Sequence, residues 1–239
     1  MTTTGRATYD AWHSILEVDR EAQAPWHELV RAHLGSERDL AGRSLLEIGC
    51  GRGGFTCWLA EQPARPARIV AVDISLVAVT KGRAFAAQHR LPGIEWEVSD
   101  IHQLAHRTAS FDTVISCETI EHVREPRRAI AELARVLRPG GRLFLTTPNY
   151  LGTMGLYRLY LRLTGRRYTE VGQPINRFTM WPRTIAWVRR TGLRIRRADG
   201  VGHYLLFPRR RPFRLRALDR LGVVTRWSAL HSLIVAEKL

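Results

Sequence analysis

Cysteine is scarce in this chain, with Cys50, Cys57 and Cys117 as its only three among 239 residues. An odd number of cysteines without metal-ligand spacing indicates reduced thiols, not a disulfide framework. The chain also lacks any uninterrupted apolar run near the roughly 18 residues that a membrane span needs. Residues 1–20 carry acids and contain no apolar core, so they do not resemble a signal peptide. We therefore expect a cytoplasmic protein without a transmembrane segment.

Lysine is nearly absent, with Lys81 and Lys238 as the only two, yet the formal net charge is +15 because arginine is abundant. Codon bias in a GC-rich genome would explain much of this excess, so the clustering of arginine is more informative than its total. The densest cluster is FPRRRPFRLR at residues 207–216. This segment suits a solvated loop, the rim of a site for an anionic substrate, or a contact with an acidic carrier protein, a membrane or nucleic acid.

Apolar runs alternate with helical patterns along most of the chain, and this alternation predicts an α/β fold with a doubly wound, mostly parallel, seven-stranded sheet. The last two strands, with a long insertion before them, fit an antiparallel hairpin that closes one edge of the sheet. The expected strands are 44–49, 68–73, 94–99, 111–117, 142–147, 193–200 and 230–239, and the clearest expected helices are 126–137, 151–163 and 181–191.

No linker divides the sequence, so we expect one domain over residues 1–239. Its expected parts are a helical cap (1–40), a cofactor-binding core (41–149), an insertion after the fifth strand (150–180), and a helix with the closing strands (181–239). Sheets of this kind bind ligands beyond the carboxyl ends of their strands. The functional residues are therefore expected directly after each apolar run.

The stretch LLEIGCGRGGF, residues 45–55, places glycines between a strand and a helix. Glycines there permit a tight turn and a close approach of the backbone to a nucleotide-like ligand. Two fingerprints fit. Gly49, Gly51 and Gly54 match the dinucleotide pattern G-x-G-x-x-G, while Gly49, Gly51 and Gly53 match the acidic-x-G-x-G-x-G loop of methyltransferases.

Three carboxylates help to decide between these fingerprints. Glu47 stands just before the glycines, where it would repel a pyrophosphate but attract the sulfonium and ammonium groups of S-adenosylmethionine. Asp73 ends the second expected strand and is able to accept both ribose hydroxyls. Asp100 ends the third and suits the exocyclic amine of adenine, although a helix N-cap is the alternative role.

Five segments now carry a clear resemblance: LLEIGCGRGG, VAVDIS, VSDIHQL, FDTVISCETIEHV and LRPGGRLFLTTPN. In this order and spacing, residues 44–149 resemble the class I S-adenosylmethionine-dependent methyltransferases with a Rossmann-like fold. The similarity is greatest to ubiquinone-type and natural-product small-molecule methyltransferases. The resemblance implies cofactor contacts from Glu47, Gly49, Cys50, Gly51, Gly53, Asp73, Ile74, Asp100, Ile101 and Cys117.

The segment CETIEHV contains Glu118, Glu121 and His122, which would share one face if Glu118 began a helical turn. Such a face would suit a divalent metal, and E-x-x-E-H is similar to the metal motif of ubiquinone O-methyltransferases and small-RNA 3′-end methyltransferases. Those families add a histidine after the insertion. Here GQPINRF offers Gln173 and Asn176 instead, so we expect no divalent metal.

His122 has two interpretations, as a general base that deprotonates the methyl acceptor or as a group that only orients the loop. His203 is a second candidate base, with a pocket-lining role as the alternative. The cap and the insertion would form the acceptor pocket, with Glu118 and Tyr150 lining it. Aromatic side chains that suit an aromatic, glycosylated or lipidic acceptor are Tyr150, Tyr157, Tyr160, Tyr168 and Trp181.

The sequence therefore predicts a methyltransferase that acts on a small molecule, at oxygen, in the biosynthesis of a secondary metabolite, a quinone, a lipid or a sugar. We expect residues 207–216 to border the acceptor entrance and to attract an anionic or carrier-bound acceptor. An RNA 2′-O-methyltransferase is the first alternative, but no separate RNA-binding module is visible. A non-catalytic cofactor-binding module is the second, and an NAD-dependent dehydrogenase is the last.

Overall fold

The computed structural model describes residues 3–19, 22–166, 175, 177, 179–205, 213–220 and 226–239. Its main sheet has seven strands in the order β3-β2-β1-β4-β5-β9-β6. The first five strands are parallel, and β9 is antiparallel to both β5 and β6, which confirms the predicted closing hairpin. The strands are β1 Ser44–Ile48, β2 Arg68–Asp73, β3 Ile94–Val98, β4 Phe111–Ser116, β5 Leu137–Pro148, β6 Arg194–Val201 and β9 His231–Glu237.

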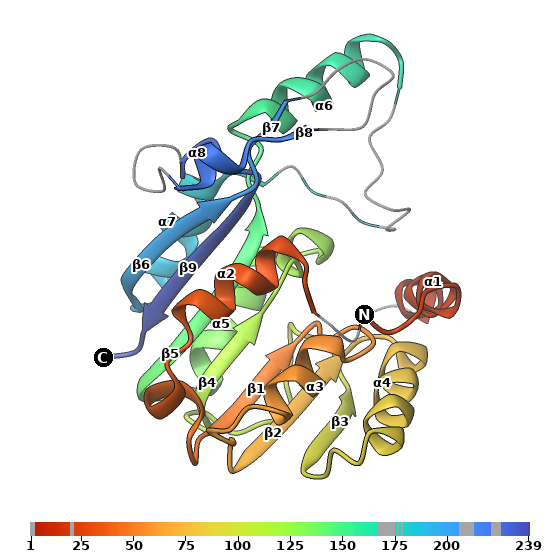
Figure 1. Cartoon of the computed structure of the whole chain (residues 1–239), viewed down its shortest axis with the longest axis vertical. Helices are drawn as coiled ribbons and strands as arrows, with labels where there is room; N and C mark the ends of the chain where they lie inside the picture. The colour runs from red at the N-terminus through yellow and green to blue at the C-terminus, as the bar shows by residue number, and fades with distance from the viewer. Residues whose placement is uncertain are drawn as a thin grey trace.

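Helices cover both faces of this sheet. In Figure 1, α2 and α3 lie in front of the sheet, whereas α5 and α7 lie behind it. The helices are α1 Thr3–Ser14, α2 Pro25–His33, α3 Gly54–Ala60, α4 Leu76–Gln88, α5 Pro126–Val136, α6 Thr153–Leu163, α7 Trp181–Arg190 and α8 Arg216–Arg220, with short helical turns η1 Ser36–Leu40 and η2 Ile120–His122. This arrangement confirms the doubly wound α/β prediction.

Alternation along the strands creates two hydrophobic cores, because successive side chains of a strand point to opposite faces. On β1, Leu45 packs into the core beneath α2 with Leu29. Its neighbour Leu46 packs into the core beneath α5 and α7, with Ile130 and Val188. All five side chains are buried. The sheet thus holds its carboxyl edge rigidly between two packed layers.

Some boundaries differ from the sequence-based expectation. Strand β5 begins at Leu137, directly after α5, where we expected a loop until residue 142. Leu137 pairs with Phe111 of β4 before the register shifts, and this buried contact draws the Pro139-Gly140-Gly141 segment into the strand. A small two-stranded sheet of β7 Tyr204–Leu205 and β8 Phe213–Arg214 was not predicted.

The insertion after β5 contributes α6, which rises beyond the carboxyl ends of the strands in Figure 1. Its Leu156 and Leu163 are mostly exposed. Within the part of the chain that the structure describes, none of the helices combines the length and hydrophobicity of a membrane crossing.

Candidate active site

A cavity of about 260 Å³ opens at the carboxyl ends of β1, β2 and β4. Nine of the ten predicted cofactor-binding residues line it: Glu47, Gly49, Cys50, Gly51, Asp73, Ile74, Asp100, Ile101 and Cys117. The tenth, Gly53, is the N-cap residue of α3 and is not part of the lining; a Cβ at this position would meet the indole of Trp96. The cavity thus gathers residues that are far apart in the sequence.

The glycine loop takes its shape from two close approaches. Gly49 has a φ of +72°, and a Cβ there would lie 2.1 Å from Oγ1 of Thr119, so no side chain fits. Gly51 has a φ of +52° and donates its backbone N–H to Oδ2 of Asp73 at 2.9 Å. The loop after β1 is therefore fastened to the carboxylate that ends β2.

Two carboxylates in the cavity wall are deeply buried. Glu47 accepts a hydrogen bond from the Thr56 hydroxyl, and burial raises the pKa of Glu47 to about 7. Asp73 accepts backbone N–H groups from Gly51 and, at 2.9 Å, from Ser75. Burial raises the pKa of Asp73 as well, against the opposing effect of those N–H donors. A cation in the cavity would favour the charged form of both groups.

Asp100 also lines the cavity and is partly exposed. Burial alone would raise the pKa of Asp100, but the backbone N–H and imidazole of His102 hold it below its usual value. Its Oδ1 accepts the His102 N–H at 3.0 Å. This local bond resembles the predicted capping role, yet residues 101–105 form turns and no helix. Asp100 therefore stays charged at the cavity wall.

The cavity lining is strongly acidic although the protein is basic. Its carboxylates come from four strand ends and the cap: Asp19, Glu47, Asp73, Asp100 and Glu118. Arg52 is the single lysine or arginine among the lining residues that the structure describes. Low-dielectric walls that carry charge of one sign attract ligands of the other sign. This cavity therefore suits a cationic ligand.

The N-terminal cap supplies one wall of the cavity through residues that the sequence reasoning did not name as site residues. Tyr9, Trp12 and His13 of α1, with Trp26 and His27 of α2, line the cavity. Tyr9 donates its hydroxyl proton to the His122 carbonyl at 3.1 Å. The sequence predicted a cap that helps to form the acceptor pocket, but it did not show which cap residues would line the cavity.

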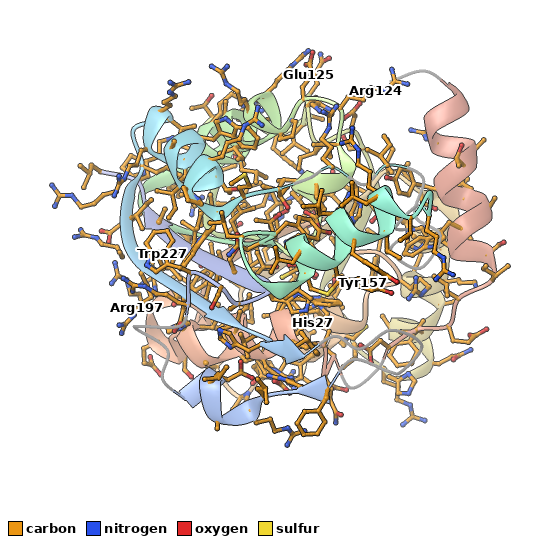
Figure 2. The ribbon with its side chains drawn as sticks, turned by 90° about the horizontal axis from the view of Figure 1, so that it is seen from above. His27, Arg124, Glu125, Tyr157, Arg197 and Trp227 are labelled. Carbon is orange, nitrogen blue, oxygen red and sulfur yellow. The ribbon has the colours of Figure 1, made fainter. Side chains whose placement is uncertain are left out.

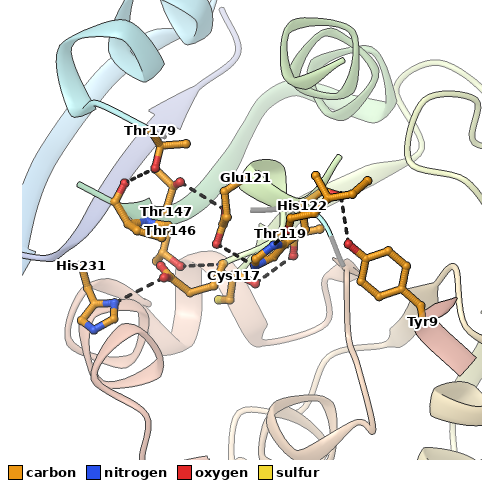
Figure 3. A network of polar contacts seen from close by, with 12 residues as sticks. Tyr9, Cys117, Thr119, Glu121, His122, Thr146, Thr147, Thr179 and His231 are labelled. Carbon is orange, nitrogen blue, oxygen red and sulfur yellow. Dashed lines mark hydrogen bonds and ion pairs between the residues drawn. The ribbon is translucent and has the colours of Figure 1, made fainter. Parts of the chain in front are cut away.

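The helical turn that would place Glu118, Glu121 and His122 on one face does not begin at Glu118. Glu118 has a left-handed φ of +44° and precedes η2, so it does not begin a helical turn. Glu118 pairs with Nδ1 of His231 at 3.3 Å. Glu121, labelled in Figure 3, instead accepts the Thr147 hydroxyl at 3.2 Å. Among the described residues, no three His, Cys, Asp or Glu side chains are grouped to hold a metal ion.

His122 lines the cavity with one ring nitrogen already engaged. Its Nδ1–H donates to the Ile175 carbonyl, which leaves Nε2 as the proton-accepting atom. This Nε2 lies 3.5 Å from Oε1 of the fully buried Glu121. Burial lowers the pKa of His122 to about 4, so the ring is neutral at pH 7. The geometry is compatible with both interpretations of His122.

His231 is the site residue that sequence reasoning missed. It is the first residue of β9, and its ring centroid lies 5.1 Å from that of Trp26 in the cavity wall. Because β9 runs antiparallel, its first residue lies beside Pro148 at the carboxyl edge of β5. Only residues at the carboxyl ends of strands were expected in the site, whereas His231 reaches the same edge of the sheet as the first residue of β9.

Two other candidates lie away from the cavity lining. His203 bonds Asp219 through Nδ1 at 2.8 Å, next to the small β7-β8 sheet. Tyr150 is buried beneath the guanidinium of Arg158, 4.3 Å from its ring centroid. Four sequence-based candidates lie outside the described residues: Tyr168, Gln173, Asn176 and the arginine run 209–211.

Known proteins are similar to this chain in sequence and in fold. Residues 46–145 match the model of the methyltransferase domain family. A ubiquinone biosynthesis O-methyltransferase from Xanthomonas oryzae pv. oryzae is 39% identical over 132 residues, which is 53% of each chain. Another, from Xanthomonas euvesicatoria pv. vesicatoria, is 32% identical over 193 residues, 75% of each chain. The chain spans about half the length of several curated relatives that it matches.

Solved structures agree on the architecture. The S-adenosylmethionine-dependent methyltransferase from Aquifex aeolicus has a TM-score of 0.65 with 12% identity, over 96% of this chain and 98% of that one. At this identity the likeness concerns the fold. Together with the match to a relative over three quarters of its length, these findings show that the chain belongs to the class I S-adenosylmethionine-dependent methyltransferases.

Proposed function

We propose that the protein methylates a hydroxyl group of a small molecule, with S-adenosylmethionine as donor. The observation that carries this proposal is the acidic cavity at the carboxyl edge of the sheet. S-adenosylmethionine supplies an electrophilic methyl group on a sulfonium cation. Glu47 would hold its cationic methionine end, and Asp100 would hold its adenine. Asp73 would accept its ribose hydroxyls.

Methyl transfer requires mainly alignment and exclusion of water. The cap residues Tyr9, Trp12 and Trp26 supply the apolar walls for both tasks. The residues at the end of β4 would receive the acceptor. His122 presents a neutral Nε2 that is able to take the hydroxyl proton, and Glu121 beside it would stabilise the resulting imidazolium. Glu118 would orient the acceptor from the neighbouring wall.

The names of relatives and the lining of the cavity support one chemical class of acceptor. Several relatives bear the name ubiquinone biosynthesis O-methyltransferase, and another is named phthiotriol/phenolphthiotriol dimycocerosates methyltransferase. We infer that this chain also takes an acceptor of quinol or lipid type, with the insertion 150–180 on the acceptor side of one catalytic unit. The RNA alternative loses the support of E-x-x-E-H, because the structure separates Glu118 from Glu121.

Calorimetry with S-adenosylhomocysteine tests the cofactor assignment. We expect Asp73→Ala to weaken binding by about 1–3 kcal/mol through lost charge-assisted hydrogen bonds. Glu95→Gln is the matched control, because Glu95 is half exposed and pairs with Arg68 away from the cavity. Since Asp73 also fastens the glycine loop, the melting temperature of each variant is measured alongside.

Binding of NADH in place of S-adenosylhomocysteine would overturn the cofactor assignment. A screen with labelled S-adenosylmethionine then tests the acceptor class. Quinols, lipid phenols and total RNA form its arms, and label in RNA alone would contradict the small-molecule proposal.

A further inference from the structure

A second hollow, of about 880 Å³, lies between α5 and α7 on the face of the sheet opposite α2 and α3. It shares no lining residue with the acidic cavity. Figure 2 labels Glu125 at its rim, where α5 begins. Five arginines line this groove: Arg127 and Arg128 from the first turn of α5, Arg183 and Arg190 from α7, and Arg177.

Among the described residues, little negative charge faces the arginines of this groove. Glu125 is the one carboxylate in the described lining, and it faces Arg128 at 3.6 Å with both side chains about 60% exposed. Such an exposed pair contributes little attraction. Arg127, Arg183 and Arg190 form no ion pair among the described residues. Like charges around one hollow repel, so a groove of this composition is stabilised by an anion.

Two contacts set the shape of the groove. The Arg183 guanidinium lies over the Trp187 ring, 5.0 Å from its centroid, which leaves its edge available to a ligand. Arg177 donates from Nε to the Val123 carbonyl at 2.8 Å and from its terminal nitrogen to the Arg124 carbonyl. Arg177 therefore anchors the wall, while Arg127, Arg183 and Arg190 remain for binding.

We propose that the groove between α5 and α7 binds a soluble small molecule that carries phosphate groups. Guanidinium groups match phosphate with paired, charge-assisted hydrogen bonds, and a phosphate with several oxygens engages more than one of them. The start of α5 adds the partial positive charge of a helix N-terminus on the same side. The concave shape favours a small ligand over a rigid nucleic-acid duplex.

Calorimetry with inorganic pyrophosphate at low ionic strength tests this site. We expect wild-type protein to bind, with an affinity that falls as salt is added. The double variant Arg127→Gln/Arg190→Gln should lose at least about tenfold in affinity, since each hydrogen bond between charged groups contributes about 1.5–3 kcal/mol. Arg183→Lys keeps the charge but removes the planar fork, so we expect an intermediate loss.

The matched control is Arg65→Gln/Arg107→Gln, which removes the same charge from two exposed arginines outside the groove. It should bind pyrophosphate like the wild type, and all variants should melt at the wild-type temperature. Equal weakening in both double variants, or no pyrophosphate binding, would overturn the proposal. So would binding of poly-glutamate or phosphatidylglycerol vesicles, but not pyrophosphate, in a manner that needs Arg127 and Arg190.

Discussion

At the residue scale, the acidic cavity is electrostatically costly until a cation enters it. Glu47 is 2% exposed, and burial raises its pKa to about 7, so near neutral pH a large share of the protein carries this residue protonated. A sulfonium or ammonium group nearby favours the charged carboxylate and lowers its pKa again. Occupancy of the proposed cofactor site is therefore linked to the release of a proton from Glu47.

Binding of S-adenosylmethionine at pH 6.5 should accordingly release part of a proton from Glu47. Calorimetry in buffers with different ionisation heats measures this number, because the apparent enthalpy then varies with the buffer. Glu47→Gln keeps an acceptor for the Thr56 hydroxyl and should bind without this buffer dependence. If wild type and Glu47→Gln depend equally on the buffer, Glu47 is not the linked group.

The Glu118–His231 pair gives a second prediction at this scale. His231 holds the carboxylate that faces the cavity, so it acts as a positioning residue for Glu118. In an assay with the acceptor found by the screen, Glu118→Ala should raise the acceptor KM by about tenfold. His231→Ala should raise it less, and His231→Gln, which retains a hydrogen-bond donor, should restore most of the loss. S-adenosylhomocysteine affinity should stay within about twofold in all three.

The Glu118–His231 pair could not be predicted from the sequence, whereas other carboxylates of the site could. Glu47, Asp73 and Asp100 could be predicted, because each lies at or just after the carboxyl end of a parallel strand, and these ends meet at one edge of the sheet. The pairing of Glu118 with His231 could not, because it depends on the direction of β9 and on the left-handed backbone at Glu118. The direction of β9 has no signal in the local sequence. A positive φ at Glu118 has none either, because non-glycine residues with positive φ are uncommon.

At the scale of elements, helix α1 closes over the site through polar contacts with the core. Asp10 accepts the Ser75 hydroxyl at 2.6 Å and the Val77 backbone N–H at 3.1 Å, at the N-terminus of α4. Lys81 of α4 donates to the Ser14 and Leu16 carbonyls. The sequence predicted a helical cap that helps to form the pocket, but these partners lie far apart in the chain and only tertiary structure brings them together.

Asp10 therefore gives a test of the cap. Asp10→Ala should release α1, which carries Tyr9, Trp12 and His13 into the cavity wall. We expect S-adenosylhomocysteine affinity to fall by about tenfold, from the loss of hydrogen bonds to a charged group. Trypsin should also cleave near Arg6 sooner. Glu17→Gln, an exposed change on the same segment, should alter neither property. Unchanged affinity in Asp10→Ala would show that the cap is dispensable.

The main elements were predictable for a physical reason. Strands β1, β2 and β4 are buried on both faces, so they appear as continuous apolar runs with glycine or acid at the end. The short pair β7 and β8 has no such run, because one side chain, Phe213, is 62% exposed. A strand that is buried on both faces requires a continuous apolar run, which is visible in the sequence. A two-residue strand at the surface requires no such run.

At the scale of the whole molecule, charge is separated between two hollows. The cavity at the carboxyl edge gathers carboxylates, and the groove between α5 and α7 gathers arginines. The overall charge of +15 is thus a poor guide to the charge at the proposed catalytic site. An anionic acceptor would meet repulsion from the cavity wall, so we expect uncharged hydroxyl acceptors to react faster than carboxylated ones of the same shape.

The stability of the molecule should depend on pH through groups that surround the cavity. Burial lowers the pKa of His13 and His122 to about 4 and that of His27 to about 3. The unfolded chain binds protons at these three residues below about pH 6.5, whereas the folded protein does not until pH 4 or lower. Their contribution to stability is therefore fully present above pH 6.5 and is lost as the pH falls toward 4.

Glu47 acts in the opposite direction between about pH 4.5 and 7, because the folded protein holds its proton there and the unfolded chain does not. Asp73 opposes the histidines in the same way, since burial also raises its pKa. The three histidines and Glu47 leave a net difference of about two protons near pH 5.5, and Asp73 makes it smaller. Each proton gives a slope of about 1.4 kcal/mol per pH unit, so the free energy of unfolding should rise with pH by at most about 2.7 kcal/mol per unit.

Urea unfolding at a series of pH values between 4.5 and 7 measures this slope, and two variants test its assignment. The unfolded chain binds more protons than the folded protein in this pH range, and His27→Leu reduces that difference by one. The slope of this variant should therefore be smaller by about 1.4 kcal/mol per pH unit. Glu47→Gln removes an opposing proton, so its slope should be steeper by a similar amount. His27 stacks on Phe55 with ring centroids 4.5 Å apart, and leucine keeps much of that apolar contact. A free energy of unfolding that is flat or rises on acidification would contradict the prediction, because the buried histidines would then carry their protons in the folded protein.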